Sequence, residues 1–176
     1  MTINNLNIMD RGFTLVETLV SIAILLIAIV GPISVIGDSV YRVYYAKDEI
    51  IAINLAQEGI EAVRQKRDSN MLAGSSWVTG LAAGYYIIDV MSTPAVISTS
   101  CTGACLTDLM PVYFDSTAGL YGQGSGFTVT TQFSRIVRIQ AVTENTSERK
   151  VTSTVKWITG GKTGTISVVE HLFKTF

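Results

Sequence analysis

The chain has 176 residues, enough for one modest domain with an extension. Its formal net charge is −1 and charged residues make up 15% of it, so it lacks the basic excess that would predict nucleic-acid binding. It contains 15 glycines and only 3 prolines, and serine and threonine are plentiful, which is typical of a β-rich domain with many turns.

An apolar block over residues 13–37 follows a short polar segment, residues 1–12, and Glu17 is the only charge within the block. As an α-helix the block would be about 37 Å long, enough to cross a hydrocarbon core of about 30 Å. Gly31–Pro32 should kink the helix and not end it, because apolar residues continue through Ile36. The block therefore predicts a membrane helix.

Three tyrosines, Tyr41, Tyr44 and Tyr45, follow the apolar block beside Arg42 and Lys47. Such a group resembles the aromatic belt that membrane proteins place at the lipid–water interface. The same residues could equally pack where the helix meets its own domain, and the sequence leaves both alternatives open.

A second helical pattern runs from Ile50 to Arg64. At about 100° per residue its polar side chains gather on one arc, and the wide apolar remainder needs a broad partner such as a sheet. We expect this helix to stop near Asp68–Asn70. The polar arc consists of Asn54, Gln57, Glu58, Glu61, Arg64 and Gln65, and the apolar face of Ile51, Ala52, Ile53, Leu55, Ala56, Ile60, Ala62 and Val63.

From residue 127 onward the apolar period becomes 2, which predicts strands half covered by a core. Residues 127–143, 151–157 and 164–176 give three strands joined by the turn-like segments ENTSER and TGGKTG. The alternation slips around Arg135–Ile136, which predicts a bulge or break there. In the first strand the covered positions are expected at Phe127, Val129, Phe133, Val137, Ile139 and Ala141. A further strand is expected at Tyr85–Val90.

No catalytic constellation is recognisable, so the sequence predicts neither an enzyme nor a cofactor. Cys101 and Cys105 form a C-x-x-x-C pair whose alternatives are a small disulfide, favoured in an exported domain, or two free thiols. A zinc site would need two more ligands, and His171 is the single histidine. The glycines of GGKTG at residues 160–164 lack the spacing and the following helix of a phosphate-binding loop, which favours a β-turn.

The apolar block has three interpretations. A secretory signal peptide cleaved after Gly37 and a plain single-pass anchor both leave Glu17 unexplained, because a carboxylate inside a membrane span is costly. In the third, GFTLVE (residues 12–17) resembles the processing site of type IV pilins and of the pseudopilins of type II secretion systems. The matching features are the glycine, an aromatic residue after it, and a glutamate at the fifth position of the mature chain.

This resemblance implies that a prepilin peptidase cleaves the Gly12–Phe13 bond, removes residues 1–12 as a leader and methylates the amine of Phe13. In a stack of such subunits, the carboxylate of Glu17 can meet the Phe13 amine of a neighbour. The implied partners are other pilin subunits, the peptidase, the membrane and an inner-membrane assembly platform, with no nucleic acid expected for this subunit. The implied location is the cytoplasmic membrane, and after assembly a surface pilus or an extracytoplasmic pseudopilus.

Two features depart from the family pattern. The leader carries Asp10 beside Arg11, so its positive charge is weak and the charges of the loops determine the membrane topology poorly. The cysteines are four residues apart in mid-chain instead of closing a long C-terminal loop, which favours a minor subunit. The competing interpretation is an exported soluble binding or enzymatic β-rich domain behind a signal peptide or a plain membrane anchor.

The predicted fold class is α+β and pilin-like, with a long N-terminal helix of about 55 residues packed on a C-terminal antiparallel sheet. We expect a leader at 1–12, a transmembrane and assembly helix at 13–37, an amphipathic second half at 38–70 and a β-rich head at 71–176.

Overall fold

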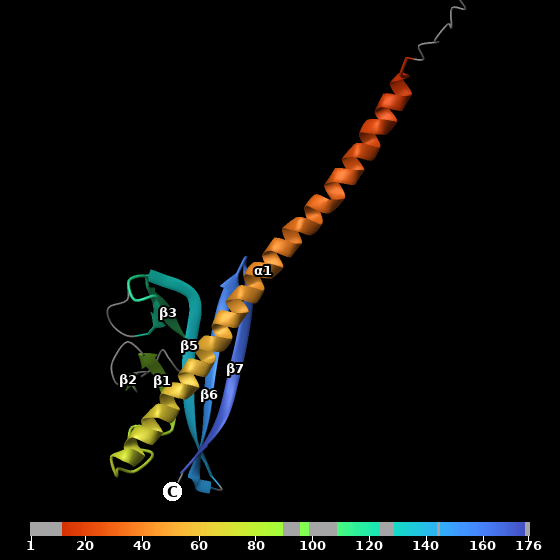
Figure 1. The fold of residues 1–176 in the computed structure, drawn as a ribbon. Coiled ribbons are helices and arrows are strands. Elements are labelled where there is room, and N and C mark those ends of the chain that lie inside the picture. The colour runs from red at the N-terminus through yellow and green to blue at the C-terminus, as the bar shows by residue number, and fades with distance from the viewer. Residues whose placement is uncertain (1–11, 90–95, 99–108, 124–128, 144, 175–176) are drawn as a thin grey trace, which may run out of the picture. The chain divides into compact units, whose positions relative to one another are not determined.

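The computed structural model describes residues 12–89, 96–98, 109–123, 129–143 and 145–174. Within these described ranges, one long helix, α1 (Leu15–Leu72), precedes seven strands (Figure 1). The chain divides into two units, Met1–Val43 and Tyr44–Phe176, so the helix contributes to both. The α+β fold class predicted from the sequence is confirmed.

The helix begins where an apolar run follows Thr14 and continues through Gly31–Pro32, although Pro32 cannot donate a main-chain hydrogen bond. It ends at Leu72, two residues beyond the predicted stop. Its second half is amphipathic as expected, because the buried positions within residues 50–64 all come from the predicted apolar face and from Gly59.

The strands form one antiparallel sheet in which β5 is central. One edge of β5 pairs with β6, which pairs in turn with β7, and the other edge is shared by β3 and β1. The expected strand at Tyr85–Val90 is β1, and the expected three-stranded meander is β5–β6–β7. The strands are β1 (Gly84–Asp89), β2 (Val96–Ser98), β3 (Met110–Asp115), β4 (Leu120–Gly122), β5 (Val129–Val142), β6 (Asn145–Thr159) and β7 (Lys162–Phe173).

The second half of α1 lies across one face of β5, β6 and β7 (Figure 1). Two apolar clusters fill the interface, and both contain residues of the helix and of the sheet. The first cluster includes Ile60, Val63, Val137, Ile139, Val151 and Leu172. The second includes Ala52, Leu55, Ala56, Phe133, Val155 and Trp157.

The predicted slip at Arg135–Ile136 does not occur in the pairing with β6. A break does fall there on the other edge of β5, where the partner changes from β3 at Arg135 to β1 at Val137. Strand β5 pairs with β6 without interruption from Phe133 to Ala141, and Arg135 points into the core with 0% exposure. A charged residue at an inward position interrupts the alternation of apolar and polar residues, so the sequence pattern looks as if the inward and outward positions had exchanged. The pairing with β6 shifts instead after Ala141, and the pairing with β3 shifts between Pro111 and Tyr113.

The apolar alternation of β5 also extends beyond the covered area. Val129 and Ala141, predicted on the covered face, are exposed, because the clusters beneath α1 include β5 only from Phe133 to Ile139. Phe127 lies outside the described residues.

Gly59 lies where the helix approaches the sheet closely. A Cβ atom at this position would lie 2.6 Å from Ser153 Oγ and 2.9 Å from Val137 Cγ2. The glycine weakens the isolated helix by about 1 kcal/mol relative to alanine, but here it lets the helix backbone sit directly on β5 and β6.

Candidate processing and assembly site

Gly12 and Phe13 lie directly before α1, and both are exposed. The bond between them is therefore not enclosed by the described part of the chain. Phe13 is 77% exposed, which is a large apolar surface for a side chain outside a core. The geometry gives a protease access from outside the helix.

Thr14 caps the N-terminus of α1. Its hydroxyl oxygen accepts a hydrogen bond from the main-chain N–H of Glu17 at 3.3 Å, and its carbonyl accepts one from Thr18 N–H at 3.2 Å. This is half of a capping box, in which a threonine and a glutamate three residues later bracket the first turn. This role of Thr14 was not predicted from the sequence, although the spacing [ST]-x-x-[DE] before an apolar run signals it.

Glu17 lies in the first turn of the helix and is exposed. Among the described residues its carboxylate forms no ion pair. A negative charge near a helix N-terminus is favourable by about 0.3–1 kcal/mol, less than the cost of about 2.5–3.5 kcal/mol for an acid at the centre of a membrane span. The helix dipole would therefore not compensate for a carboxylate at the centre of a membrane span.

The hydroxyl groups next to Glu17 are satisfied within the helix itself. Thr18 Oγ1 donates to the carbonyl of Leu15 at 2.8 Å, and Ser21 Oγ donates to the carbonyl of Glu17 at 2.7 Å. Side chains bonded in this way can enter an apolar environment without an external partner. This leaves the Glu17 carboxylate as the one charged side chain of the described part of the apolar block.

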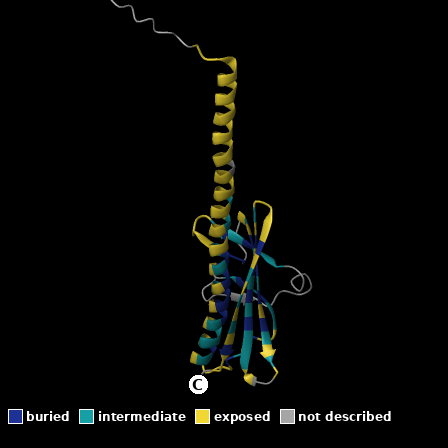
Figure 2. Cartoon of the chain, turned by 90° about the vertical axis from the view of Figure 1, so that its right-hand side faces the viewer, coloured by how far each residue is buried: buried dark blue, intermediate teal, exposed yellow. Residues whose placement is uncertain are grey.

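The apolar block presents its side chains outward over its described length (Figure 2). α1 contains a window long and apolar enough to cross a membrane, and none of that window is buried by the rest of the described chain. Exposed apolar surface of this extent requires lipid or other proteins to cover it. The large exposed residues include Leu15, Val16, Leu19, Ile22, Leu25, Leu26, Ile27, Ile29, Val30, Ile33 and Ile36.

The tyrosines after the apolar block were predicted either to lie at a lipid interface or to pack on the chain's own domain, and Tyr45 packs on the domain. Its ring packs on Trp157 with centroids 5.7 Å apart and adds to the second core cluster, as the packing alternative predicted for that residue. Tyr44 is 58% exposed and stays available for an interface with lipid or protein.

Arg135 forms a buried polar cluster that the sequence analysis missed. Its guanidinium donates to the carbonyls of Leu55 and Ile88 at 3.0 Å each, and it forms an ion pair with Glu58 at 2.6 Å. Gln123 accepts a further bond from it at 3.0 Å. Burial lowers the pKa of Arg135 and the charge of Glu58 raises it, and an arginine stays protonated at neutral pH in either case.

This cluster joins α1, β1, β5 and the residue after β4, so its role is to position these elements against one another. The remaining candidate sites are the two cysteines and a possible metal site. Cys101 and Cys105 lie outside the described residues. No group of three or more potential metal ligands is found in the described ranges of the chain.

Comparison with known proteins gives one match. Residues 9–31 match the family model described as the prokaryotic N-terminal methylation motif. No curated protein and no solved structure matches the chain. The matched segment contains the Gly12–Phe13 bond, the capping residue Thr14, Glu17 and most of the apolar block. Together with the exposed apolar helix, it supports a type IV pilin-like protein with a single-pass start in the membrane and a structural role.

Proposed function

We propose that this chain is a minor pilin or minor pseudopilin, a structural subunit of a type IV pilus or of a type II secretion pseudopilus. The observation that carries the proposal is the methylation motif at residues 9–31 on a helix whose apolar side chains are exposed. Other pilin or pseudopilin subunits, held by an assembly platform in the inner membrane, are the partners that cover this surface.

Processing is the first step of the proposed function. A prepilin peptidase hydrolyses the Gly12–Phe13 amide with water and releases residues 1–12. It then transfers a methyl group from a methyl-donor cosubstrate to the new amine of Phe13, which loses a proton. Two features support this site: both residues are exposed, and Thr14 already fixes the first turn of the helix immediately after the bond.

Assembly is the second step, and we assign its charged contact to Glu17. The carboxylate pairs with the Phe13 ammonium of an adjoining subunit, an attraction of about 4 kcal/mol at about 4 Å for an effective dielectric constant of about 20, before desolvation is subtracted. Desolvation offsets much of this attraction, so the main effect of the pair is to select one axial offset between neighbouring helices. Packing of apolar side chains supplies the cohesion.

Mass spectrometry of the mature N-terminus tests the proposal. We expect a chain that begins with N-methylated Phe13. We expect Gly12→Val to leave the uncut precursor in the membrane, because this change replaces the motif glycine directly before the cleaved bond. A mature chain that begins at Asp38 would identify a secreted domain behind a signal peptide. Retention of Met1 in the wild-type chain would identify a plain anchor.

A further inference from the structure

The free edge of the sheet lies along β7. This strand pairs with β6 over its whole length, from Thr159↔Lys162 to Glu148↔Phe173, and no other described strand pairs with it. Figure 1 shows β7 at the side of the sheet. An edge of this kind presents unpaired main-chain N–H and C=O groups to a further strand.

The β6–β7 turn fixes which main-chain groups face outward. Gly160 and Gly161 have φ angles of 55° and 81°, which fit a two-residue turn of type I′, so Thr159 and Lys162 exchange both main-chain hydrogen bonds. From this pair onward, every second residue of β7 directs its main-chain N–H and C=O groups toward β6. Lys174 follows the same alternation, because its N–H donates to the carbonyl of Ser147 at 2.9 Å. The outward groups therefore belong to six exposed residues: Thr163, Thr165, Ser167, Val169, His171 and Phe173.

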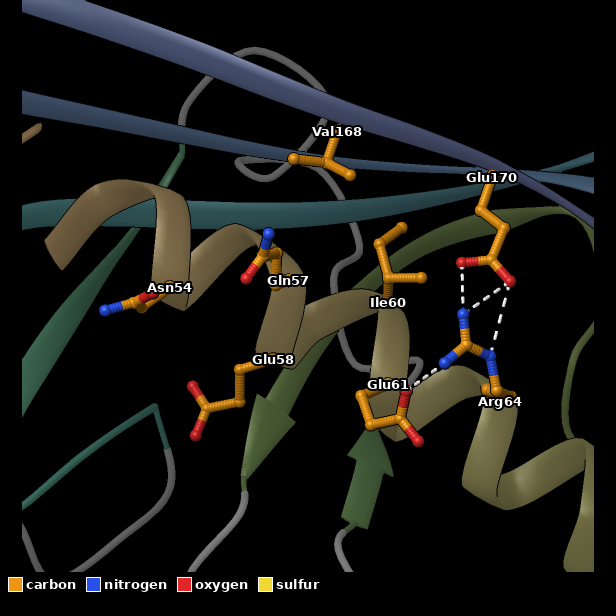
Figure 3. Close-up of a pocket in the computed structure, with 8 residues that line it drawn as sticks. All are labelled: Asn54, Gln57, Glu58, Ile60, Glu61, Arg64, Val168 and Glu170. Atoms are coloured by element: carbon orange, nitrogen blue, oxygen red, sulfur yellow. Dashed lines mark hydrogen bonds and ion pairs between the residues drawn. The ribbon is translucent and has the colours of Figure 1, made fainter. Parts of the chain in front are cut away.

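A groove of about 600 Å³ runs between this edge and α1. Figure 3 shows Ile60 of the helix and Val168 of β7 on opposite sides of it, and Arg64 joined to Glu170 and Glu61. Arg64 Nη2 lies 2.6 Å from Glu170 Oε2. The hydrogen bond that Arg64 donates to Glu170 raises the pKa of Arg64, so its guanidinium stays protonated at neutral pH.

The edge and the groove form one surface because β7 belongs to both. A strand added to β7 would bond to the six outward residues, and every second side chain of that strand would enter the groove. Main-chain pairing gives affinity in such recognition, and the pocket under alternate side chains gives specificity.

We propose that β7 and α1 form a strand-addition groove for an extended segment of a partner protein. The segment places an apolar side chain against Val168, which is partly buried above the core residue Ile60, and, two positions further, a basic side chain beside Glu61. The preference for a basic residue follows from the charges of the lining. Arg64 pairs with both Glu61 and Glu170, and Glu58 pairs with Arg135, which leaves one carboxylate in excess.

A second copy of this chain is a poorer occupant. Strands β2 and β4 have only three residues each, and β5 and β6 are paired along both edges. Among the described strands only another β7 matches the edge in length. Such a pair closes a two-fold dimer and leaves no edge for a filament that grows in one direction. The inference uses the unit Tyr44–Phe176 alone, so it does not depend on processing or assembly.

Hydrogen exchange of the full chain in detergent micelles tests the groove. The probe is a synthetic peptide that alternates threonine with isoleucine, valine and one lysine. We expect binding to slow exchange at the main-chain amides of Thr165, Ser167 and Val169. A matched peptide with glutamate in place of lysine should bind more weakly, and Glu61→Lys should reverse this preference.

A pair of variants separates main-chain pairing from side-chain contact. Ser167→Pro removes an outward N–H without touching the β6 ladder, and proline is tolerated at such edge positions. We expect it to weaken peptide binding about tenfold or more. Ser167→Ala loses only the 2.8 Å contact with Thr154 Oγ1 and should bind like the wild type. Val169→Pro repeats the test at the next outward position.

Equal binding by Ser167→Pro and Ser167→Ala would overturn the proposal, as would unchanged exchange at the edge amides at saturating peptide. Concentration-dependent protection of these amides without peptide would show that the occupant is a second copy, which also contradicts the proposal. None of these outcomes alters the mature N-terminus, so they remain distinct from a failure of the proposed function.

Discussion

A guanidinium occupies the centre of the interface between helix and sheet. On β5, Arg135 lies between Phe133 and Val137, which belong to different apolar clusters. On α1 the matching position is Glu58, between the residues that contact each cluster. The core is therefore two apolar halves joined by one polar connection, and that connection fixes the position of the helix along the sheet.

We expect Arg135→Met to lower the free energy of unfolding by about 3 kcal/mol, because Glu58 loses its partner and two buried carbonyls lose their donor. Denaturant titration of the full chain in detergent measures it, with Trp77 and Trp157, both buried, as fluorescent probes. The matched control is Arg138→Met, on the exposed face of the same strand, which should cost no more than about 1 kcal/mol for its contact with Tyr85. Equal losses in both variants would contradict the role of Arg135.

We expect Gly59→Ala to cost about 1–3 kcal/mol despite the better helix propensity of alanine, because its methyl group would overlap Ser153 Oγ. Ser153→Ala should recover part of this loss, since Ser153 Oγ is buried without a hydrogen-bond partner and its removal frees space. Gly37→Ala in the same helix meets no atom within 4 Å and should be neutral or stabilising. A double-mutant cycle in denaturant measures the coupling, and additive effects would rule out the contact.

At the scale of elements, the sequence predicted which segments are helix or strand better than it predicted which residues contact one another. The helix of residues 50–64 and the last three strands follow clear periods of 3.6 and 2, so propensity, pattern and packing agree there. Arg135 broke the pattern of β5 because an inward charge is visible in sequence only as an interruption. Its partners come from positions up to 80 residues away, which no local pattern can reveal.

The motif of the candidate site, like the helices and strands, could be recognised because it is local in sequence. Gly12, Phe13 and Glu17 are adjacent in sequence, so their motif could be recognised without a structure. The groove along β7 could not, because the free edge depends on pairing between distant strands and on the phase set by Gly160 and Gly161.

Pro32 gives a prediction for the first half of α1. The proline lacks the N–H that would bond to the carbonyl of Ala28, so the turn around Gly31–Pro32 is weaker than the turns before it. In assembled filaments we expect the amides of this turn to exchange faster than those of residues 19–27, and Pro32→Ala to remove the difference. Uniform protection across the block in wild-type filaments would contradict this prediction.

At the scale of the whole molecule, Glu17 must be tested for capping and for assembly separately. Glu17→Gln keeps a side chain suited to the capping box but removes the charge, and we expect it to be processed normally yet to enter filaments poorly. Thr14→Ala removes the cap at a cost of about 1 kcal/mol but keeps the carboxylate, and should assemble better than Glu17→Gln. Immunoblots of the sheared filament fraction against the membrane fraction measure both, and the reverse order would assign Glu17 to capping alone.

The internally bonded hydroxyls of Thr18 and Ser21 have a consequence for which subunits can share one fibre. Because these hydroxyls are bonded internally, the block offers its neighbours apolar side chains and the single carboxylate of Glu17, and such a surface discriminates little between sequences of similar shape. We therefore expect this subunit to mix with unlike chains that carry a carboxylate at the matching position, so that the head domains can vary along one fibre.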